Sequence, residues 1–240
     1  MNLNHQQIMA IAVKTIGQRN NPDWHSYRNY RFTASNFGKI LKAEEHSFKN
    51  PDSKQLTMVK DEVIKNTPIQ PCPLMQWGID HEAGAIKEYE KRSGFSVKET
   101  GIWLFPSGHL AASPDGLIMS PSDKQQILGC VEIKCPYRMR NVNVTRPDHW
   151  NGNLDYLDSS NNLLRGHQYY HQIQGEIIAT NSAWCDFVVW CPTDLHIERI
   201  FPDKPWRRIY LSKLEYIYFP NFLRPEDRAF TYYRRYPDSM

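Results

Sequence analysis

The feature that most constrains the fold is a series of short strand-like segments between residues 95 and 136. The segment "FSVKETGIWLF" (95–105) predicts two short strands. The segment "HLAASPDGLIMS" (109–120) predicts two more, around a turn at Pro114-Asp115-Gly116, and "QILGCVEIKCP" (126–136) predicts another. Because apolar runs separated by turn residues are typical of antiparallel neighbours, we expect a β-meander in this region.

Helical segments precede and follow these strands. The hydroxyls of Thr33 and Ser35 offer a cap to the segment "NFGKILK", and Gly94 ends a long helix. The order of helices, sheet, helix, strands and helix predicts a mixed α/β domain with helices packed on a central sheet. The expected helices are 3–17, 36–42, 55–65, 74–93, 163–180 and 205–219, the later strands are 185–192 and 197–203, and 43–54 and 67–73 are a loop and a proline-rich linker.

Length and composition suit a single globular domain. A chain of 240 residues suits one domain. The formal net charge of +3 permits a nucleic-acid partner without requiring one. No signal-peptide pattern and no run of ~20 apolar residues is present, so we expect an intracellular protein that does not enter a membrane. The cysteines lack C-x-x-C spacing and are predicted to be reduced, buried thiols rather than ligands of a metal or an iron–sulfur cluster; they are Cys72, Cys130, Cys135, Cys185 and Cys191.

Three charged residues of the strand region suggest chemistry. Glu132 and Lys134 are two positions apart, so their side chains share one face of a strand, while Val131 and Ile133 point to the other. A meander would bring Asp115 beside them. Two neighbouring carboxylates repel each other unless a cation lies between them, and oxygen ligands select Mg²⁺ or Mn²⁺. A lysine there can orient or deprotonate a water molecule, which suits phosphodiester hydrolysis. The alternative is a surface hairpin with an exposed Glu–Lys pair and an ordinary turn aspartate.

The segments that carry these residues resemble a known family. "SPDGL" followed by "VEIKCP" is similar to the PD-(D/E)-x-K nuclease core and, more closely, to the lambda-exonuclease/YqaJ viral recombinase family. "WHSYRNYRFTASNFGKIL" (24–41), "WGIDHEAGAIKEYEKRSG" (77–94) and "HQYYHQIQGEI" (167–177) resemble three further motifs of that family. The resemblance implies a restriction-endonuclease-like core, a central mixed β-sheet flanked by helices. It divides the single nuclease domain into an N-terminal helix (1–23), the family core (24–220) and a C-terminal extension (221–240).

The resemblance also implies a role for each matching residue. The catalytic set would be Asp115, Glu132, Lys134, Glu82 and Gln172, with Gln172 holding Lys134 or the water. Two Mg²⁺ or Mn²⁺ ions would be held by Asp115, Glu132, Glu82 and the carbonyl of Ile133. The 5′-phosphate of a DNA end would be bound by Arg28, Ser35 and Ser113.

Taken without the family, these residues have ordinary explanations. Glu82 lies beside a helix face expected to include Ile79, Ala83 and Ile86, where a glutamate is more often solvated. Gln172 could simply bond to neighbouring helices, and Ser35 could be only a helix cap.

The function implied is a metal-dependent DNA exonuclease acting 5′→3′ on double-stranded ends and leaving 3′ overhangs for recombination or repair. The family also implies a homotrimeric ring and, by analogy, a single-strand annealing protein as partner. The alternatives are a nuclease of opposite polarity or with structure-specific cleavage, and a catalytically idle DNA-binding scaffold. The basic and aromatic stretch 224–236 could contact DNA or form a loose tail. Such a protein would act in the nucleus or the cytoplasm, in a host cell if it is viral.

Overall fold

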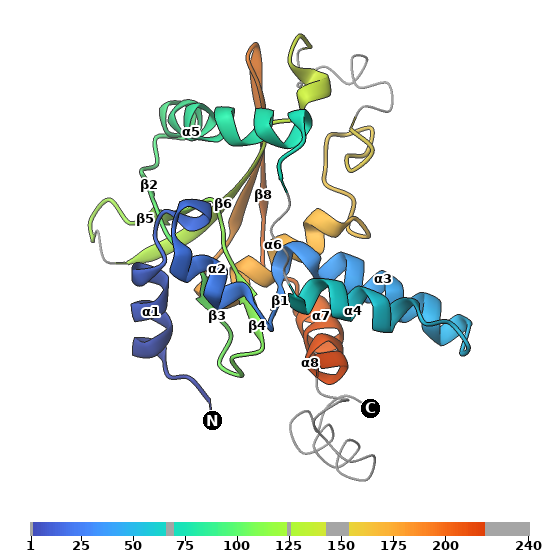
Figure 1. Cartoon of the computed structure of the whole chain (residues 1–240). Helices are drawn as coiled ribbons and strands as arrows, with labels where there is room; N and C mark the ends of the chain where they lie inside the picture. The colour runs from blue at the N-terminus through green and yellow to red at the C-terminus, as the bar shows by residue number, and fades with distance from the viewer. Residues whose placement is uncertain (1, 66–69, 124–125, 143–153, 219–240) are drawn as a thin grey trace.

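The computed structural model describes residues 2–65, 70–123, 126–142 and 154–218. Its centre is a five-stranded sheet in the order β2-β5-β6-β7-β8 (Figure 1). Strands β6 and β7 are parallel and the other neighbours are antiparallel, so the sheet is mixed, as predicted. The strands are β2 (Val97–Lys98), β5 (Gly116–Met119), β6 (Ile127–Lys134), β7 (Cys185–Cys191) and β8 (Asp194–Ile200).

A second, separate sheet has three strands in the order β1-β4-β3. Its strands are β1 (Phe32–Thr33), β3 (Trp103–Leu104) and β4 (Leu110–Ala112). The predicted meander is therefore only partly correct, because the chain changes sheets between β4 and β5. Pro114 has no N–H to donate to a ladder, and the N–H of Asp115 donates to the carbonyl of Val131 in β6, 3.1 Å away.

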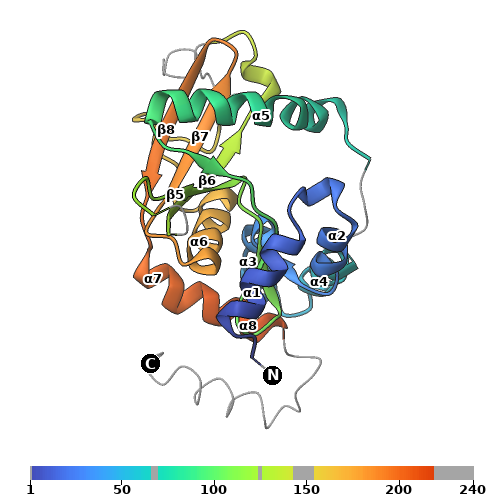
Figure 2. The ribbon, with the colours of Figure 1, turned by 90° about the vertical axis from the view of Figure 1, so that its left-hand side faces the viewer.

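Two helices cover opposite faces of the five-stranded sheet (Figure 2). They are α5 (Pro73–Ser93) and α6 (Gln168–Thr180), the latter connecting the parallel strands β6 and β7. Val131 and Ile133 pack in one buried cluster with Tyr89 of α5, whereas Cys130 packs in another with Ile173 of α6. Strand β6 thus alternates as the sequence predicts, with its charged residues on the α6 side.

The apolar face of α5 differs from the prediction. Ala83 is exposed, and the buried positions are Ala85 and Tyr89, one helical turn apart. Ile79 and Ile86 are half-buried. The hydroxyl of Tyr89 donates to Oδ2 of the buried Asp186 in β7 at 2.6 Å. Ala85 and Tyr89, rather than Ala83, therefore form the part of α5 that is buried against the strands.

Helix α3 packs closely against α6. It extends over Ala34–Lys49, and α4 (Gln55–Lys65) packs against it. A Cβ added to Gly38 would lie 2.6 Å from the Cα of Gln168, so only glycine permits this approach. Helix α3 exceeds the predicted 36–42 because Ala43 continues its buried face, which shortens the predicted loop 43–54.

The N-terminal segment packs on the small sheet. Helix α1 (His5–Lys14) has a capping box between Asn4 and Gln7 and contacts β3. The hydroxyl of Thr15 accepts a hydrogen bond from the N–H of Ile102 at 2.9 Å. Two short helices follow, η1 (Gln18–Asn20) and α2 (Pro22–Arg28).

The last described elements form a broken helix. They are α7 (Lys204–Trp206), the π-helical η4 (Arg207–Leu211) and α8 (Ser212–Tyr218), where a single helix over 205–219 is predicted. Helix α6 begins later than predicted because the N–H of Leu163 donates to Glu198 of β8 at 2.6 Å. The extension 221–240, with its basic and aromatic stretch, lies outside the described residues. Short 3₁₀ helix η2 (Tyr137–Met139) follows β6.

The cysteine prediction is correct for three of the five residues. Cys130, Cys185 and Cys191 are buried, whereas Cys72 is exposed and Cys135 is half-buried, and none is in a disulfide. None of the helices in the described residues has the length and apolar character needed to cross a membrane.

Candidate active site

The end of β6 brings two of the predicted carboxylates together. The N–H of Ile133 donates to Oδ2 of Asp115 at 2.7 Å, while Gly116 is paired with Val131. Asp115 therefore lies beside the strand position next to Glu132. The change of sheet at Pro114 allows this, since Asp115 is free of any ladder in the small sheet and its side chain turns toward β6.

Glu132 is buried and fixed on one oxygen. Its Oε1 forms an ion pair with Lys134 and accepts a hydrogen bond from the Nε2 of Gln172 at 2.6 Å. Its Oε2 is buried without a hydrogen-bond partner. The ammonium of Lys134 also lies 4.5 Å from the ring centroid of Tyr169. Gln172 thus holds the carboxylate of Glu132 in this structure. The same carboxylate oxygen pairs with Lys134, so Gln172 supports the position of Lys134 indirectly.

Glu176 is a buried acidic residue that the sequence analysis did not single out. It follows Gln172 by one turn of α6, and its Oε1 accepts from the same Nε2 of Gln172 at 2.8 Å. Its carboxyl group and the thiols of Cys130 and Cys185 place their ligand atoms within 4.8 Å of one another. A glutamate four residues after a predicted site glutamine, on a helix packed inside the core, was the signal that could have found it.

The electrostatics of the site reflect crowded carboxylates. Burial, then the charges of Glu132 and Glu82, raise the pKa of Asp115 well above its ordinary value. Burial likewise raises the pKa of Glu82, against the lowering effect of Arg19. Burial alone would lower the pKa of Lys134, but Glu132 and Asp115 outweigh it and the pKa lies above its ordinary value. Three carboxylates that disfavour one another's charge form a site suited to a cation.

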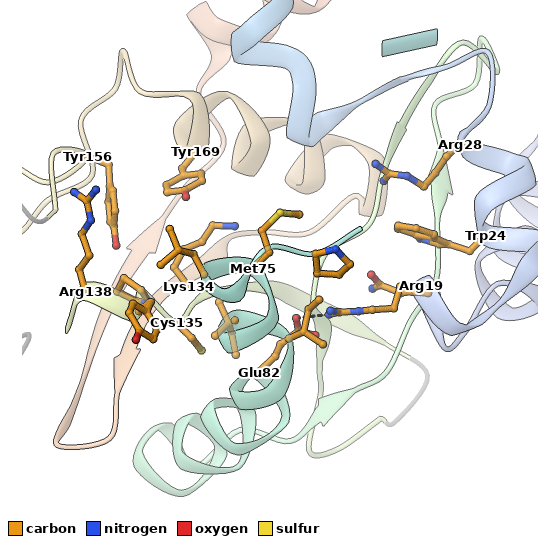
Figure 3. Close-up of a pocket in the computed structure, with 18 of the residues that line it drawn as sticks. Arg19, Trp24, Arg28, Met75, Glu82, Lys134, Cys135, Arg138, Tyr156 and Tyr169 are labelled. Carbon is orange, nitrogen blue, oxygen red and sulfur yellow. Dashed lines mark hydrogen bonds and ion pairs between the residues drawn. The ribbon is translucent and has the colours of Figure 1, made fainter. Parts of the chain in front are cut away.

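A cavity of about 700 Å³ opens in front of these groups (Figure 3). Glu82, Ile133 and Lys134 line it directly, and Asp115 and Glu132 lie behind this wall, bonded to Ile133 and Lys134. The N-terminal segment, α5, the end of β6 and η2 supply most of the lining. Its cationic lining residues are Arg19, Arg28, Lys134 and Arg138.

Two of the three predicted phosphate-binding residues come together beside the cavity. The Arg28 guanidinium lies 4.3 Å from the ring of Trp24, and the indole N–H of Trp24 donates to the hydroxyl of Ser113 at 3.0 Å. Burial lowers the pKa of Arg28 to about 10. Arg28 and Trp24 line the cavity, and the hydrogen bond places Ser113 behind Trp24.

Ser35 lies elsewhere. It is exposed, is not among the lining residues, and its hydroxyl lies 3.2 Å from that of Thr33. It is also not the helix cap, because α3 begins at Ala34 and its N-cap is Thr33, which makes no side-chain capping bond. Thr33 instead pairs with the side chains of Ser35 and Asn36.

The donor set fits a hard divalent cation. Asp115, Glu132 and Glu82 offer oxygen atoms, and the unpartnered Oε2 of Glu132 is a buried acceptor that a cation would satisfy. His81 is not counted in this set, because a hard cation such as Mg²⁺ prefers oxygen donors over imidazole nitrogen. Its Nδ1 lies 2.8 Å from the carbonyl of Trp77, and its ring stacks on that indole.

A protein-family model matches more than half of the chain. Residues 23–183 match the family model described as YqaJ-like viral recombinase domain. No curated protein matches the chain.

Two exonucleases are among the solved structures with a similar fold. One is LHK-Exo, an alkaline exonuclease from Laribacter hongkongensis, with 19% identity, a TM-score of 0.55 and coverage of 90% of this chain and 94% of that one. The same enzyme in complex with dAMP has 20% identity, the same coverage and a TM-score of 0.57. A phage-related exonuclease from Haemophilus somnus 129PT has 14% identity, a TM-score of 0.51 and coverage of 88% and 96%. At these identities the likeness shows the fold, and it confirms the predicted mixed sheet flanked by helices.

Proposed function

The chain belongs to the YqaJ-like viral recombinase domain family, and we propose on this premise that it is a metal-dependent deoxyribonuclease acting on the ends of double-stranded DNA. One observation carries the proposal. Asp115, Glu132 and Lys134 meet at the end of β6, beside a cavity that Lys134 lines together with Glu82 and three arginines, Arg19, Arg28 and Arg138. Carboxylates for a cation next to cations for phosphates suit phosphodiester hydrolysis.

Asp115, Glu132, Glu82 and the carbonyl of Ile133 are the proposed holders of two Mg²⁺ or Mn²⁺ ions. When bound, such ions polarise the phosphate and neutralise its charge. Lys134 contributes an ammonium that positions the attacking water and stabilises negative charge on the phosphate oxygens. Gln172 keeps Glu132 in place, since its amide holds the oxygen that also pairs with Lys134.

The proposed polarity is 5′→3′, which leaves 3′ single-stranded overhangs. Support comes from Arg28, whose guanidinium offers several parallel N–H donors at the cavity wall. Its guanidinium lies over the ring of Trp24, and Trp24 in turn bonds to Ser113. Together they suit a terminal 5′-phosphate. Ser35 would join them only if the DNA end extends to the start of α3.

The wider assembly follows from the family. A homotrimeric ring around DNA would explain processive cutting, and a single-strand annealing protein would receive the overhang, in recombination or repair in the nucleus or cytoplasm of a host cell. Light scattering with and without duplex DNA tests the ring, and a monomer in both states would contradict it.

Digestion of linear duplexes tests the activity and its polarity. We expect a 5′-phosphorylated duplex to be degraded from its 5′ ends in Mg²⁺, a 5′-hydroxyl duplex to be degraded more slowly, and EDTA to stop both. Labels at either end distinguish the polarity. Equal cutting of sealed circles would instead indicate an endonuclease.

Single substitutions separate chemistry from binding. Glu132→Ala and Lys134→Ala are expected to reduce cleavage by at least ~100-fold while DNA binding persists, because the first removes a proposed cation ligand and the second removes the ammonium that acts on the water and the phosphate. If the wild-type protein cuts no DNA with Mg²⁺ or Mn²⁺, the chain is a DNA-binding scaffold and the nuclease proposal fails.

A further inference from the structure

Arg19 is a cavity-lining residue outside every motif discussed above. Its Nη2 lies 2.9 Å from Oε2 of Glu82, and the dashed line in Figure 3 marks this contact. The side chains are 38% and 32% exposed, so the ion pair faces solvent in the cavity. An ion pair that is partly open to solvent contributes only modestly to stability, and Arg19 can therefore exchange Glu82 for another anion at modest cost.

The backbone that carries Arg19 is firmly held. Next to it, Gln18 adopts a positive φ of 42° and its Nε2 donates to the carbonyls of Thr100 at 3.2 Å and Pro114 at 2.9 Å. The carbonyl of Arg19 lies 2.8 Å from Nε2 of His25. A fixed backbone with a half-exposed guanidinium suits a residue whose side chain changes partner.

The position of Arg19 joins the two parts of the site. In Figure 3 its side chain extends from the side of Trp24 and Arg28 toward Glu82. It therefore lies between the proposed cation ligands and the proposed binding site for the DNA end. A guanidinium binds a phosphate through two parallel hydrogen bonds, which a single exposed carboxylate oxygen does not match.

We propose that Arg19 binds the phosphate of the DNA strand that is cut, and that Glu82 holds its guanidinium until that phosphate arrives. This inference rests on the proposed nuclease function. It has a second consequence, because Arg19 places a positive charge on a carboxylate that the divalent cation also needs. The guanidinium therefore opposes cation binding at Glu82 in the absence of DNA.

Removal of Arg19 should affect the two ligands in opposite directions. Titration calorimetry of Mn²⁺ without DNA is expected to show about 3- to 10-fold tighter binding to Arg19→Ala than to wild type, because a like charge is gone. Cleavage is expected to lose at least about tenfold in kcat/KM, because a charged phosphate contact is gone. Arg19→Lys keeps the positive charge but cannot form two parallel hydrogen bonds to a phosphate. Its Mn²⁺ affinity should therefore stay near wild type while cleavage falls.

Salt dependence gives a readout that needs no activity. On a Lys134→Ala background in Ca²⁺, the slope of log Kd for a 5′-phosphorylated duplex against log salt should become shallower by about one when Arg19→Ala is added. Lys14→Ala is the matched control. Lys14 belongs to the same N-terminal segment but pairs with Asp23 outside the cavity, so its loss should change neither Mn²⁺ affinity nor cleavage.

The outcomes are distinct. Weaker Mn²⁺ binding by Arg19→Ala would mean that Arg19 only orients Glu82, and would overturn the proposal. An unchanged salt slope with unchanged cleavage would also overturn it. If the wild type does not cut DNA but the slope changes as expected, the nuclease function fails and phosphate binding by Arg19 stands.

Discussion

Replacement of Glu176 by glutamine should reduce the loss of stability that occurs as the pH rises above the ordinary glutamate pKa. Glu176 is 0% exposed, its Oε1 accepts from Gln172 and its Oε2 has no hydrogen-bond partner. Burial, then the charges of Glu132 and Cys130, raise its pKa well above the ordinary value. The folded state therefore keeps the proton on Glu176 while the unfolded state releases it.

The sign and size of the effect follow from proton linkage. Below the ordinary glutamate pKa both states are protonated, and Glu176 contributes its full stability. As pH rises above that value the unfolded chain ionises first, so the free energy of unfolding falls by up to about 1.4 kcal/mol per pH unit until the raised pKa is passed. Glutamine has the same shape and no proton to lose, so Glu176→Gln removes this slope.

Urea unfolding in EDTA at several pH values measures the difference. Near pH 4 the two proteins should be similar in stability, and above it Glu176→Gln should become progressively more stable than wild type. Glu45→Gln is the control, since Glu45 is exposed, and the hydrogen bond and charge of Lys49 lower its pKa.

A difference that stays constant with pH would refute the reasoning. It would mean that Glu176 ionises in the folded protein as readily as in the unfolded chain. A charged Glu176 would then lie beside Glu132 in the absence of a cation. That would contradict the mutual repulsion of the buried carboxylates described above.

Two further stability predictions concern packing, and both are measured by thermal or urea unfolding. Gly38→Ala should destabilise by about 1–3 kcal/mol because its Cβ would meet the backbone of Gln168, whereas Gly84→Ala, a helical glycine with no atom within 4 Å of such a Cβ, should stabilise by up to about 1 kcal/mol. Equal effects at both glycines would contradict the close approach of α3 and α6. Tyr89→Phe should cost about 1–3 kcal/mol, because it removes the donor to buried Asp186 while Arg199 remains bonded to both oxygens of that carboxylate. An unchanged stability would mean that the two bonds from Arg199 suffice.

The strands could be predicted because their patterns are local. Alternation along β6 places Val131 and Ile133 on the side of α5 and Glu132 on the side of α6, as the sequence predicts. The pairing of strands could not be predicted, because it depends on distant partners. Nothing in "SPDGL" alone indicates that the chain leaves one sheet at Pro114 and enters another at Gly116.

The site residues divide in the same way. Asp115, Glu132 and Lys134 follow from spacing and are contiguous in the structure. Arg19 was missed because its partner, Glu82, lies 63 residues further along the chain. Glu176 was missed although its partner Gln172 is only four residues away, because the link from Gln172 to Glu132 is visible only in the fold. Ser35 shows the converse, since a hydroxyl at the expected sequence position lies outside the cavity lining.

The hydrogen bonds of Gln18 bear on where a minimal fragment can begin. The family match starts at residue 23, after Gln18 and Arg19, yet both residues line the cavity. The amide of Gln18 joins Thr100 to Pro114, the residue that immediately precedes Asp115. A fragment trimmed to the matched segment would retain every motif residue. It would lose the two hydrogen bonds by which Gln18 fixes the backbone next to Asp115. The recognisable module and the unit that has to be expressed intact are therefore different lengths of chain.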